Sequence, residues 1–154
     1  MKNILAKLLI GAVMVSVGAF GADASLGTWK LNMEKSKFSP APILKSLTST
    51  REASDGGVKV TSTGEQADGT PINASYTAKY NGSNTPVTGA PWDTLAIKRV
   101  NAHTFTATAK KTNGKYRSTS RTIISKDGKT MTTTVTGTNA EGKAFNNTMV
   151  YDKQ

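Results

Sequence analysis

The sequence contains no cysteine and only one histidine, His103, among its 154 residues. Without cysteine, neither disulfides nor thiolate-bound metals can contribute to the fold. A lone histidine cannot build a metal centre or a Ser-His-Asp triad, and its place in a turn predicts a solvated side chain. No glycine-rich phosphate loop precedes a helical pattern. The sequence therefore predicts no metal and no cofactor, and it disfavours an enzyme.

Acidic residues are scarce, with 10 Asp and Glu against 20 Lys and Arg, and the formal net charge is +10. A basic surface can indicate a nucleic acid or an anionic membrane as partner. Here the lysines are spread over turns and strand exteriors, with no arginine-rich block and no aromatic RNA-binding signature. We therefore predict a soluble basic surface and no nucleic-acid partner.

Long apolar runs are absent except at the start, where Leu8 to Phe20 follows the basic residues Lys2 and Lys7. These 13 residues fall short of the ~20 needed to span a bilayer. The small-x-small set Ala22-Asp23-Ala24 completes a secretory signal pattern. We expect a signal peptide over 1–24, a single exported domain over 25–154 without a transmembrane segment, and a location in the periplasm or outside the cell.

The rest of the chain is divided by short turn signals. Asn-Gly and Asp-Gly pairs favour tight hairpins, because these residues tolerate positive φ. The breaks are Ser54-Asp55-Gly56-Gly57, Asp68-Gly69, Asn81-Gly82, Asn101-Ala102-His103, Asn113-Gly114, Asp127-Gly128 and Glu141-Gly142. One hairpin after another over about a hundred residues indicates an antiparallel meander, which closes most readily into a barrel.

Between the turns, apolar residues alternate with Ser and Thr, as in strands with two unlike faces. Nine strands are expected, with a short tenth near Pro86-Val87-Thr88. The fold prediction is all-β, a single up-and-down antiparallel barrel of 8–10 strands, with a β-sandwich as the alternative. An outer-membrane barrel is disfavoured because the outward residues are Lys, Thr and Asn.

Turn lengths predict the strand register. A two-residue Asn113-Gly114 turn pairs Phe105 with Thr122, and a two-residue Asp127-Gly128 turn pairs Thr122 with Thr133. For the last hairpin, a three-residue loop over 140–142 is needed to turn its apolar residues inward. The resulting inner set contains Tyr116, Ser118, Ser120, Thr122, Ile124, Met131, Thr133, Val135, Gly137, Phe145, Asn147, Met149 and Tyr151.

The predicted inner face is rich in small residues and hydroxyls, including Gly64, Ala74, Gly137, Ser49 and Ser62. Because unpaired hydroxyls are costly in a dry core, this composition favours a barrel with free volume. Large apolar residues are expected to plug one end, namely Trp29, Leu31, Met33, Phe105, Ile124 and Met131.

Arg51 and Arg99 are the main candidate binding residues, because both are predicted to face inward. A buried guanidinium needs an anionic partner, which a ligand carboxylate would supply. Alternatively, each arginine lies near a strand end and extends to water, or stacks on an aromatic ring. Further hydrogen-bonding or stacking groups are expected from Tyr76, Tyr80, Tyr116, Ser118, Ser120, Asn147, Tyr151 and Trp92.

Two connecting segments are expected to be irregular. The proline-broken stretch over 34–43 is predicted to cover one barrel end. The longest loop, over 81–93, carries Trp92 and is predicted to form a rim or lid, or to pack against the barrel.

The opening Gly27-Thr28-Trp29-Lys30-Leu31 resembles that of lipocalins and fatty-acid-binding proteins, the calycin group. Together with Lys35-Ser36-Lys37-Phe38-Ser39, residues 86–89, Ile97-Lys98-Arg99 and 125–131, it is most similar to exported, uncharacterised bacterial lipocalin-like proteins. The resemblance covers nearly the whole predicted mature chain and implies a barrel, but it does not indicate which ligand the barrel holds.

Three features of the calycin relatives are missing. The Arg-x-Tyr clamp of fatty-acid-binding proteins would place an arginine where Met149 stands, and the segment over 33–44 is too short for their two-helix lid. Avidin-like biotin binding, which relies on several tryptophans, is disfavoured because the chain has only Trp29 and Trp92.

The leading functional hypothesis is an exported binding protein for a small hydrophobic or amphipathic, anionic ligand. A small barrel enzyme of isomerase, cyclase or hydrolase type is the first alternative, and it would need an acid or base on the inner face. An envelope protein that acts through an outer basic cluster, with Lys110, Arg117, Lys126 and Lys129, is the second.

Overall fold

The computed structural model describes residues 21–154, which form eleven β-strands and no helix. No part of this region could therefore cross a bilayer as a helix. Most of the predicted signal peptide, residues 1–20, lies outside the described residues. The strands are β1 (Gly27–Leu31), β2 (Lys37–Ser39), β3 (Leu44–Ser54), β4 (Gly57–Gln66), β5 (Pro71–Lys79), β6 (Asn81–Pro86), β7 (Thr94–Asn101), β8 (Thr104–Lys110), β9 (Arg117–Ile124), β10 (Thr130–Thr138) and β11 (Ala144–Lys153).

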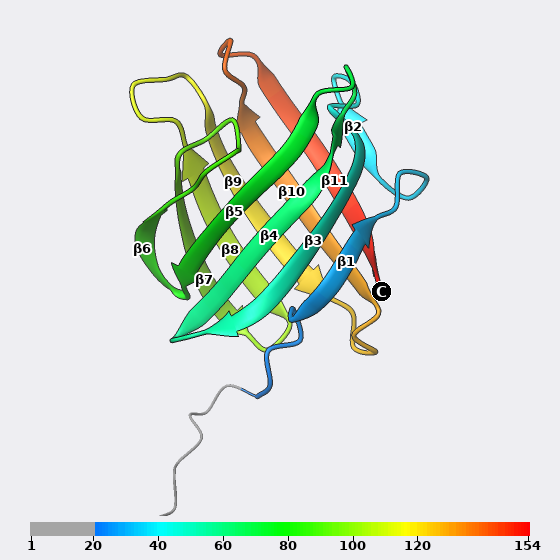
Figure 1. Cartoon of the computed structure of the whole chain (residues 1–154), viewed down its shortest axis with the longest axis vertical. Helices are drawn as coiled ribbons and strands as arrows, with labels where there is room; N and C mark the ends of the chain where they lie inside the picture. Colours follow the sequence, from blue (N-terminus) through cyan, green and yellow to red (C-terminus); the bar gives the residue numbers. More distant parts are fainter. Residues whose placement is uncertain (1–20) are drawn as a thin grey trace, which may run out of the picture.

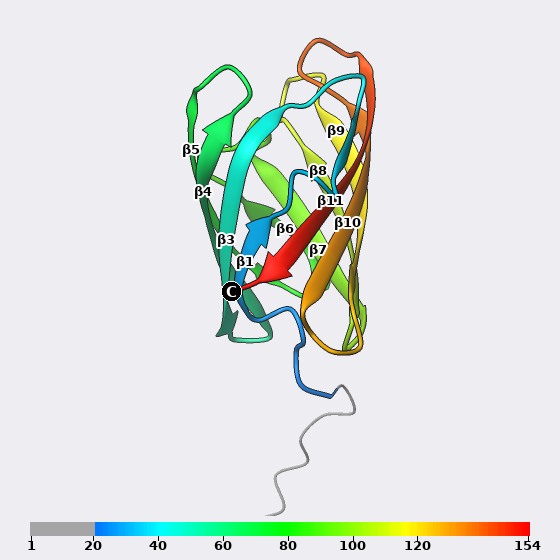
Figure 2. The same ribbon diagram turned by 90° about the vertical axis from the view of Figure 1, so that its right-hand side faces the viewer.

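The strands form one antiparallel sheet that curls into a nearly closed barrel, as Figures 1 and 2 show. The sheet order is β5-β4-β3-β1-β11-β10-β9-β8-β7-β6, and β2 pairs separately with β11. The edge strands β5 and β6 meet at a seam, where Ser75 and the Thr88 segment form an antiparallel bridge with two backbone hydrogen bonds of 3.1 and 3.2 Å. The predicted up-and-down barrel is confirmed.

The predicted registers are also confirmed. Phe105 pairs with Thr122, and Thr122 pairs with Thr133. In the last hairpin, Gly137 pairs with Phe145, as the three-residue loop requires, and Gly142 has a φ of +85°. The turns at Asn113-Gly114 and Asp127-Gly128 were predicted to have two residues but are wider. Their hairpins close at the backbone hydrogen bonds between Lys111 and Tyr116 and between Ser125 and Thr130.

Several predicted boundaries were wrong. The segment over 34–43 contains strand β2, which pairs with β11, and the predicted long loop over 81–93 is strand β6 in its first half. Met33 does not plug the barrel, since β1 ends at Leu31 and Met33 lies in an exposed turn. Strand β2 has only three residues, and β6 ends in proline and pairs irregularly with β7, so neither carries a clear alternating pattern.

Two inner glycines do not indicate free volume. A Cβ on Gly64 would overlap the carbonyl oxygen of Ser46, and a Cβ on Gly137 would overlap that of Arg117. The neighbouring strand backbone occupies the space that a side chain would need. Glycine is therefore required here by the close approach of two strands.

The most deeply buried part of the hydrophobic core lies in the lower half of the barrel, the end at which the C-terminus lies in Figure 1, and Val87 and Leu95 extend the core upward. Trp29 and Val58 have no exposed surface, and Ile124 is 2% exposed. Around them pack Leu31, Val60, Ala78, Ile97, Phe105, Met131 and Tyr151. Burial of this apolar surface is the main stabilising contribution to the closed end.

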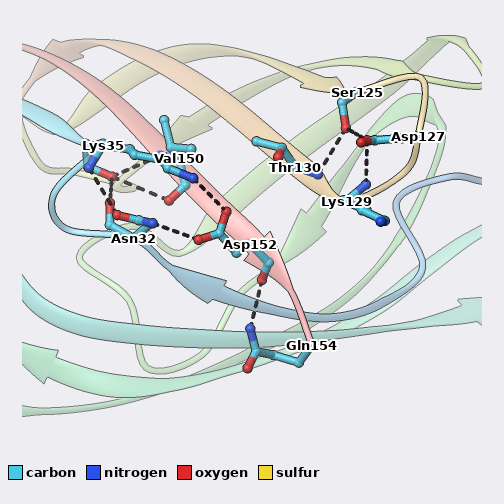
Figure 3. A network of polar contacts seen from close by, with 10 residues as sticks. Asn32, Lys35, Ser125, Asp127, Lys129, Thr130, Val150, Asp152 and Gln154 are labelled. Carbon is cyan, nitrogen blue, oxygen red and sulfur yellow. Dashed lines mark hydrogen bonds and ion pairs between the residues drawn. The ribbon is translucent and has the colours of Figure 1, made fainter.

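The turn between β1 and β2 is tied to β11 by the polar network drawn in Figure 3. Asn32 Nδ2 donates to Asp152 at 2.7 Å, and the ammonium group of Lys35 lies 3.5 Å from the same carboxylate. The hydroxyl of Ser36 donates to the Asn32 carbonyl and accepts from the Val150 amide. These contacts hold β2 across the side of the barrel.

Candidate functional site

The inward-facing residues differ in burial. Those of the closed core are buried, and so are Leu95, Tyr116, Ser118 and Asn147 nearer the upper end. The half-buried inward residues include Leu47, Ile72, Ala74, Ala107, Ser120, Val135, Phe145 and Met149. These residues retain exposed surface, unlike those of the closed core.

Arg51 lies on the inner wall near the lower end of β3, where it pairs with Gly27 at the start of β1. It stands opposite Val60 on β4, which in turn pairs with Tyr76 on β5. The Nε atom of Arg51 is buried and has no hydrogen-bond partner among the described residues. A buried guanidinium N–H without an acceptor is costly, so the position favours an anionic group that the protein itself does not provide.

Three tyrosines share the electrostatic environment of Arg51. Burial raises the pKa of Tyr151, Tyr76 adds to this increase, and the Arg51 charge opposes it. Burial also raises the pKa of Tyr80 to about 12, with a further contribution from the Asp23 carboxylate. The Tyr80 and Tyr151 phenols therefore remain protonated at neutral pH, and a phenol O–H can serve as a hydrogen-bond donor.

No Asp or Glu faces inward from the eleven described strands. The nearest carboxylate at the lower end, Asp23, accepts hydrogen bonds from the Ser25 amide and hydroxyl and, at 2.5 Å, from the Tyr80 phenol. It is fully engaged as an acceptor. The inner wall thus offers cationic and neutral donors, which suit binding of an anion better than general-base catalysis.

Four of the inner hydroxyls are paired with one another. Ser49 and Ser62 lie 2.7 Å apart across β3 and β4, and Thr122 and Thr133 lie 2.8 Å apart across β9 and β10. Cross-strand pairing removes the cost of burying these groups without requiring water or a ligand. The hydroxyl content of the inner face is therefore weaker support for a wet cavity than the sequence indicated.

A second group of predicted residues lies at the upper end. Trp92 stacks on Tyr116 with ring centroids 5.2 Å apart, and Tyr116 lies 5.9 Å from Phe145. The indole Nε1 of Trp92 is buried without a partner among the described residues. Ser118 is the neighbouring inward residue on β9, and Asn147 is 2% exposed and accepts a hydrogen bond from the Ser39 amide.

Arg99 is separated from this upper group. Its Nη2 donates to the Gly21 carbonyl at 2.6 Å, its Nε donates to the Asn101 carbonyl, and the guanidinium lies 6.0 Å from the Phe105 ring. The strand-end alternative therefore describes the observed geometry of Arg99. The structure brings Arg51, Tyr76, Tyr80 and Tyr151 together low in the barrel, and Trp92, Tyr116 and Ser118 together above. Asn147 shares a cross-strand row with Val135 and Ser120 between the two groups.

Asp23 and Ser25 were missed by sequence reasoning. Both were placed at the signal cleavage site, yet Ser25 has no exposed surface and its carbonyl accepts the Trp29 indole N–H at 2.8 Å. No local pattern marks these residues, because their shared partner Tyr80 is more than 50 residues away. His103 Nδ1 is buried without a partner among the described residues, so this side chain is less solvated than predicted.

Asp93 holds the Trp92 loop against the β8–β9 hairpin. Its Oδ1 accepts the Thr112 amide at 2.9 Å and the Thr112 hydroxyl at 3.0 Å, while Oδ2 lies 3.4 Å from Lys111. Hydrogen bonds, chiefly the one from the Thr112 amide, lower the pKa of Asp93 to about 2. The carboxylate thereby positions the indole of the adjacent Trp92.

We expect Asp93→Asn to loosen this loop. Because the folded-state pKa lies below the ordinary 3.8, the Asp93 contribution to stability is present above pH 3.8 and is lost as pH falls toward 2. The variant should therefore be less stable at pH 7 and should lose less stability between pH 4 and about 2. Urea unfolding at several pH values measures this, and Asp55→Asn in an exposed turn is the control. Equal pH dependence in both variants would contradict the assignment.

No protein-family description and no curated protein sequence matches this chain. Within residues 21–154, no group of three or more His, Asp or Glu side chains is arranged to hold a metal ion.

Proposed function

We propose that this protein binds a small, partly apolar, anionic ligand inside the barrel, with Arg51 as the anchor of the anionic group. The observation that carries the proposal is the buried Nε of Arg51, which has no hydrogen-bond partner among the described residues and lies on the inner wall near the lower end of the barrel. A ligand carboxylate would accept this N–H and complete a charge-assisted hydrogen bond.

The remaining predicted residues divide between the two parts of such a ligand. The phenols of Tyr76 and Tyr151 lie near enough to Arg51 to interact electrostatically with the same anionic group. Above them, the ring stack of Trp92 and Tyr116 offers an apolar surface to the rest of the ligand. The lower core lies at the opposite end of the barrel from this ring stack.

This proposal includes export to the periplasm or the cell exterior and kinship with the lipocalin-like proteins. The signal pattern over 1–24 and the Gly27-Thr28-Trp29 opening support both parts. The barrel topology is compatible with a calycin-like fold. The absence of an inward carboxylate from the described strands favours a binding protein over the enzyme alternative.

Isothermal titration with decanoate and with its uncharged counterpart 1-decanol tests the proposal. We expect decanoate to bind at least about tenfold more tightly, because only the carboxylate pairs with Arg51. Arg51→Met should abolish that preference, since it keeps most of the side-chain volume and removes the charge. Lys59→Met, an outward cation on β4, is the matched control.

Equal decanoate affinity in Arg51→Met and the parent protein would overturn the role of Arg51. Native mass spectrometry of the purified protein gives a second readout. We expect a bound organic acid that is released on denaturation, and its occupancy should fall in Arg51→Met but not in Lys59→Met.

A further inference from the structure

The outer face of β7–β10 carries a regular pattern that the interior site does not explain. Across β8, β9 and β10, Thr108 pairs with Thr119 and Thr119 with Thr136, which forms a row of three threonines. One step above this row, Lys110 pairs with Arg117. One step below it, Lys98 pairs with Thr106 and Thr106 with Arg121. A threonine row is therefore flanked by two basic rows.

The charges on this face are unbalanced. Lys110 and Arg117 are like charges directly opposite each other on neighbouring strands, an arrangement that is destabilising by itself. No Asp or Glu occurs among the outward residues of β7, β8, β9 and β10 to offset them. An external anion would relieve the repulsion.

The same face is hollowed. One hollow of about 440 Å³ is lined by Asn84, Thr94, Thr108, Ala109, Lys110, Arg117, Ser118, Thr119, Thr136 and Gly137. A second, of about 410 Å³, is lined by Thr119, Ser120, Arg121, Ile123, Thr132, Thr134 and Thr136. Thr119 and Thr136 line both, so the two hollows border each other at the threonine row.

Arg117 is held in place at the upper edge of this face. Its Nη1 donates to the carbonyls of Lys111, Gly114 and Tyr116, at 3.2, 3.3 and 2.8 Å. These three bonds restrict the guanidinium before any partner arrives. A restricted cation loses less conformational entropy on binding than a free surface lysine does.

We propose that this threonine-and-arginine face binds a linear acidic polysaccharide of the polyuronate type. Successive sugars of an extended chain turn their carboxylates to opposite edges, and the basic rows lie on opposite sides of the threonine row. Four residues along a strand separate the two rows, which corresponds to roughly 13 Å. Sugar hydroxyls would bond to the threonine hydroxyls, while Lys110 and Arg117 on one edge and Lys98 and Arg121 on the other pair with carboxylates.

Other polyanions fit this face less well. Single-stranded nucleic acid is bound by stacking on aromatic side chains, and no aromatic residue points outward from β7–β10. Surface binding to a membrane requires an apolar face that can insert into it. The described β7–β10 strands expose two large apolar side chains, Ile123 and Val100, which are too few to form such a face. The neutral hydroxyl row between two cationic rows matches a hydroxyl-rich chain.

The test is titration of the purified protein with an octamer of polymannuronate. We expect Arg117→Gln combined with Arg121→Gln to weaken binding at least tenfold. Thr119→Val combined with Thr136→Val should weaken it about three- to tenfold without a change in charge. Lys126→Gln combined with Lys129→Gln, in the lower hairpin, removes the same net charge from another place and should change the affinity less than twofold.

Several results would overturn the proposal. Equal weakening by the arginine pair and the lysine pair would indicate attraction to net charge alone. Tighter binding of oligothymidine or of phosphatidylglycerol vesicles than of the octamer would assign the face to nucleic acid or to membrane. Thermal melts of each variant identify any loss of folding. Arg51→Met should leave octamer binding unchanged, which separates this proposal from the interior ligand.

Discussion

Replacement of Trp29 by alanine is expected to lower the free energy of unfolding by about 3–5 kcal/mol. Trp29 has no exposed surface and lies at the centre of the closed lower end. Its removal leaves a cavity among Leu31, Val58 and their neighbours, and the Ser25 carbonyl loses the indole donor at 2.8 Å. The ammonium group of Lys153, 5.2 Å from the ring centroid, loses its cation–π contact as well.

Urea unfolding followed by far-ultraviolet circular dichroism measures the effect of the Trp29 substitution. Trp29→Phe should show an intermediate loss, because it keeps an aromatic ring and removes only the donor and part of the volume. Trp92→Ala is the matched control, since that indole is only half-buried. If Trp92→Ala lowered the free energy of unfolding as much as Trp29→Ala, the main core would not lie at the lower end.

Replacement of Gly89 by alanine is expected to open the seam between the edge strands and to cost about 3 kcal/mol. Gly89 has a φ of +74°, which costs an alanine about 1–2 kcal/mol. A Cβ would also overlap the Asn73 carbonyl oxygen on β5. The loop must then move away, and the two backbone hydrogen bonds between Ser75 and Thr88 are lost.

Gly128→Ala is the control for Gly89→Ala, because it measures the conformational cost of a positive φ without any effect on the seam. Gly128 has a φ of +70° but no atom lies within 4 Å of the position of its Cβ. It should therefore lose only the backbone contribution, roughly 1–2 kcal/mol. Hydrogen exchange at the Ser75 and Thr88 amides should accelerate in Gly89→Ala alone. Equal stability losses and unchanged exchange would show that the seam does not depend on this approach.

The long strands could be predicted because each has many alternating positions between two recognisable turns. The registers followed from turn length, since a shift of one residue would have turned Phe145, Asn147, Met149 and Tyr151 outward. Strands β2 and β6 could not be predicted in the same way, because they are short and carry proline or irregular pairing. These two strands form because β2 pairs with β11 and β6 pairs with β7.

The candidate site was predicted in part. Alternation correctly turned Arg51 and Tyr151 inward, yet it treated Arg51 and Arg99 as equivalent. They differ because Arg99 reaches the Gly21 and Asn101 carbonyls at the strand end, while the Nε of Arg51 has no acceptor among the described residues. Which acceptors lie within reach depends on segments far away in the chain.

By itself, the sequence determined the class of the fold, the direction of the meander and the face on which most side chains lie. These properties depend on local turn chemistry and on the two-residue period of a strand. Only the tertiary structure decided that one end is closed by Trp29 and its neighbours, that Gly64 and Gly137 are small because strands approach closely, and that Asp23 belongs to the barrel. Those outcomes depend on contacts between residues distant in sequence, which no local period encodes.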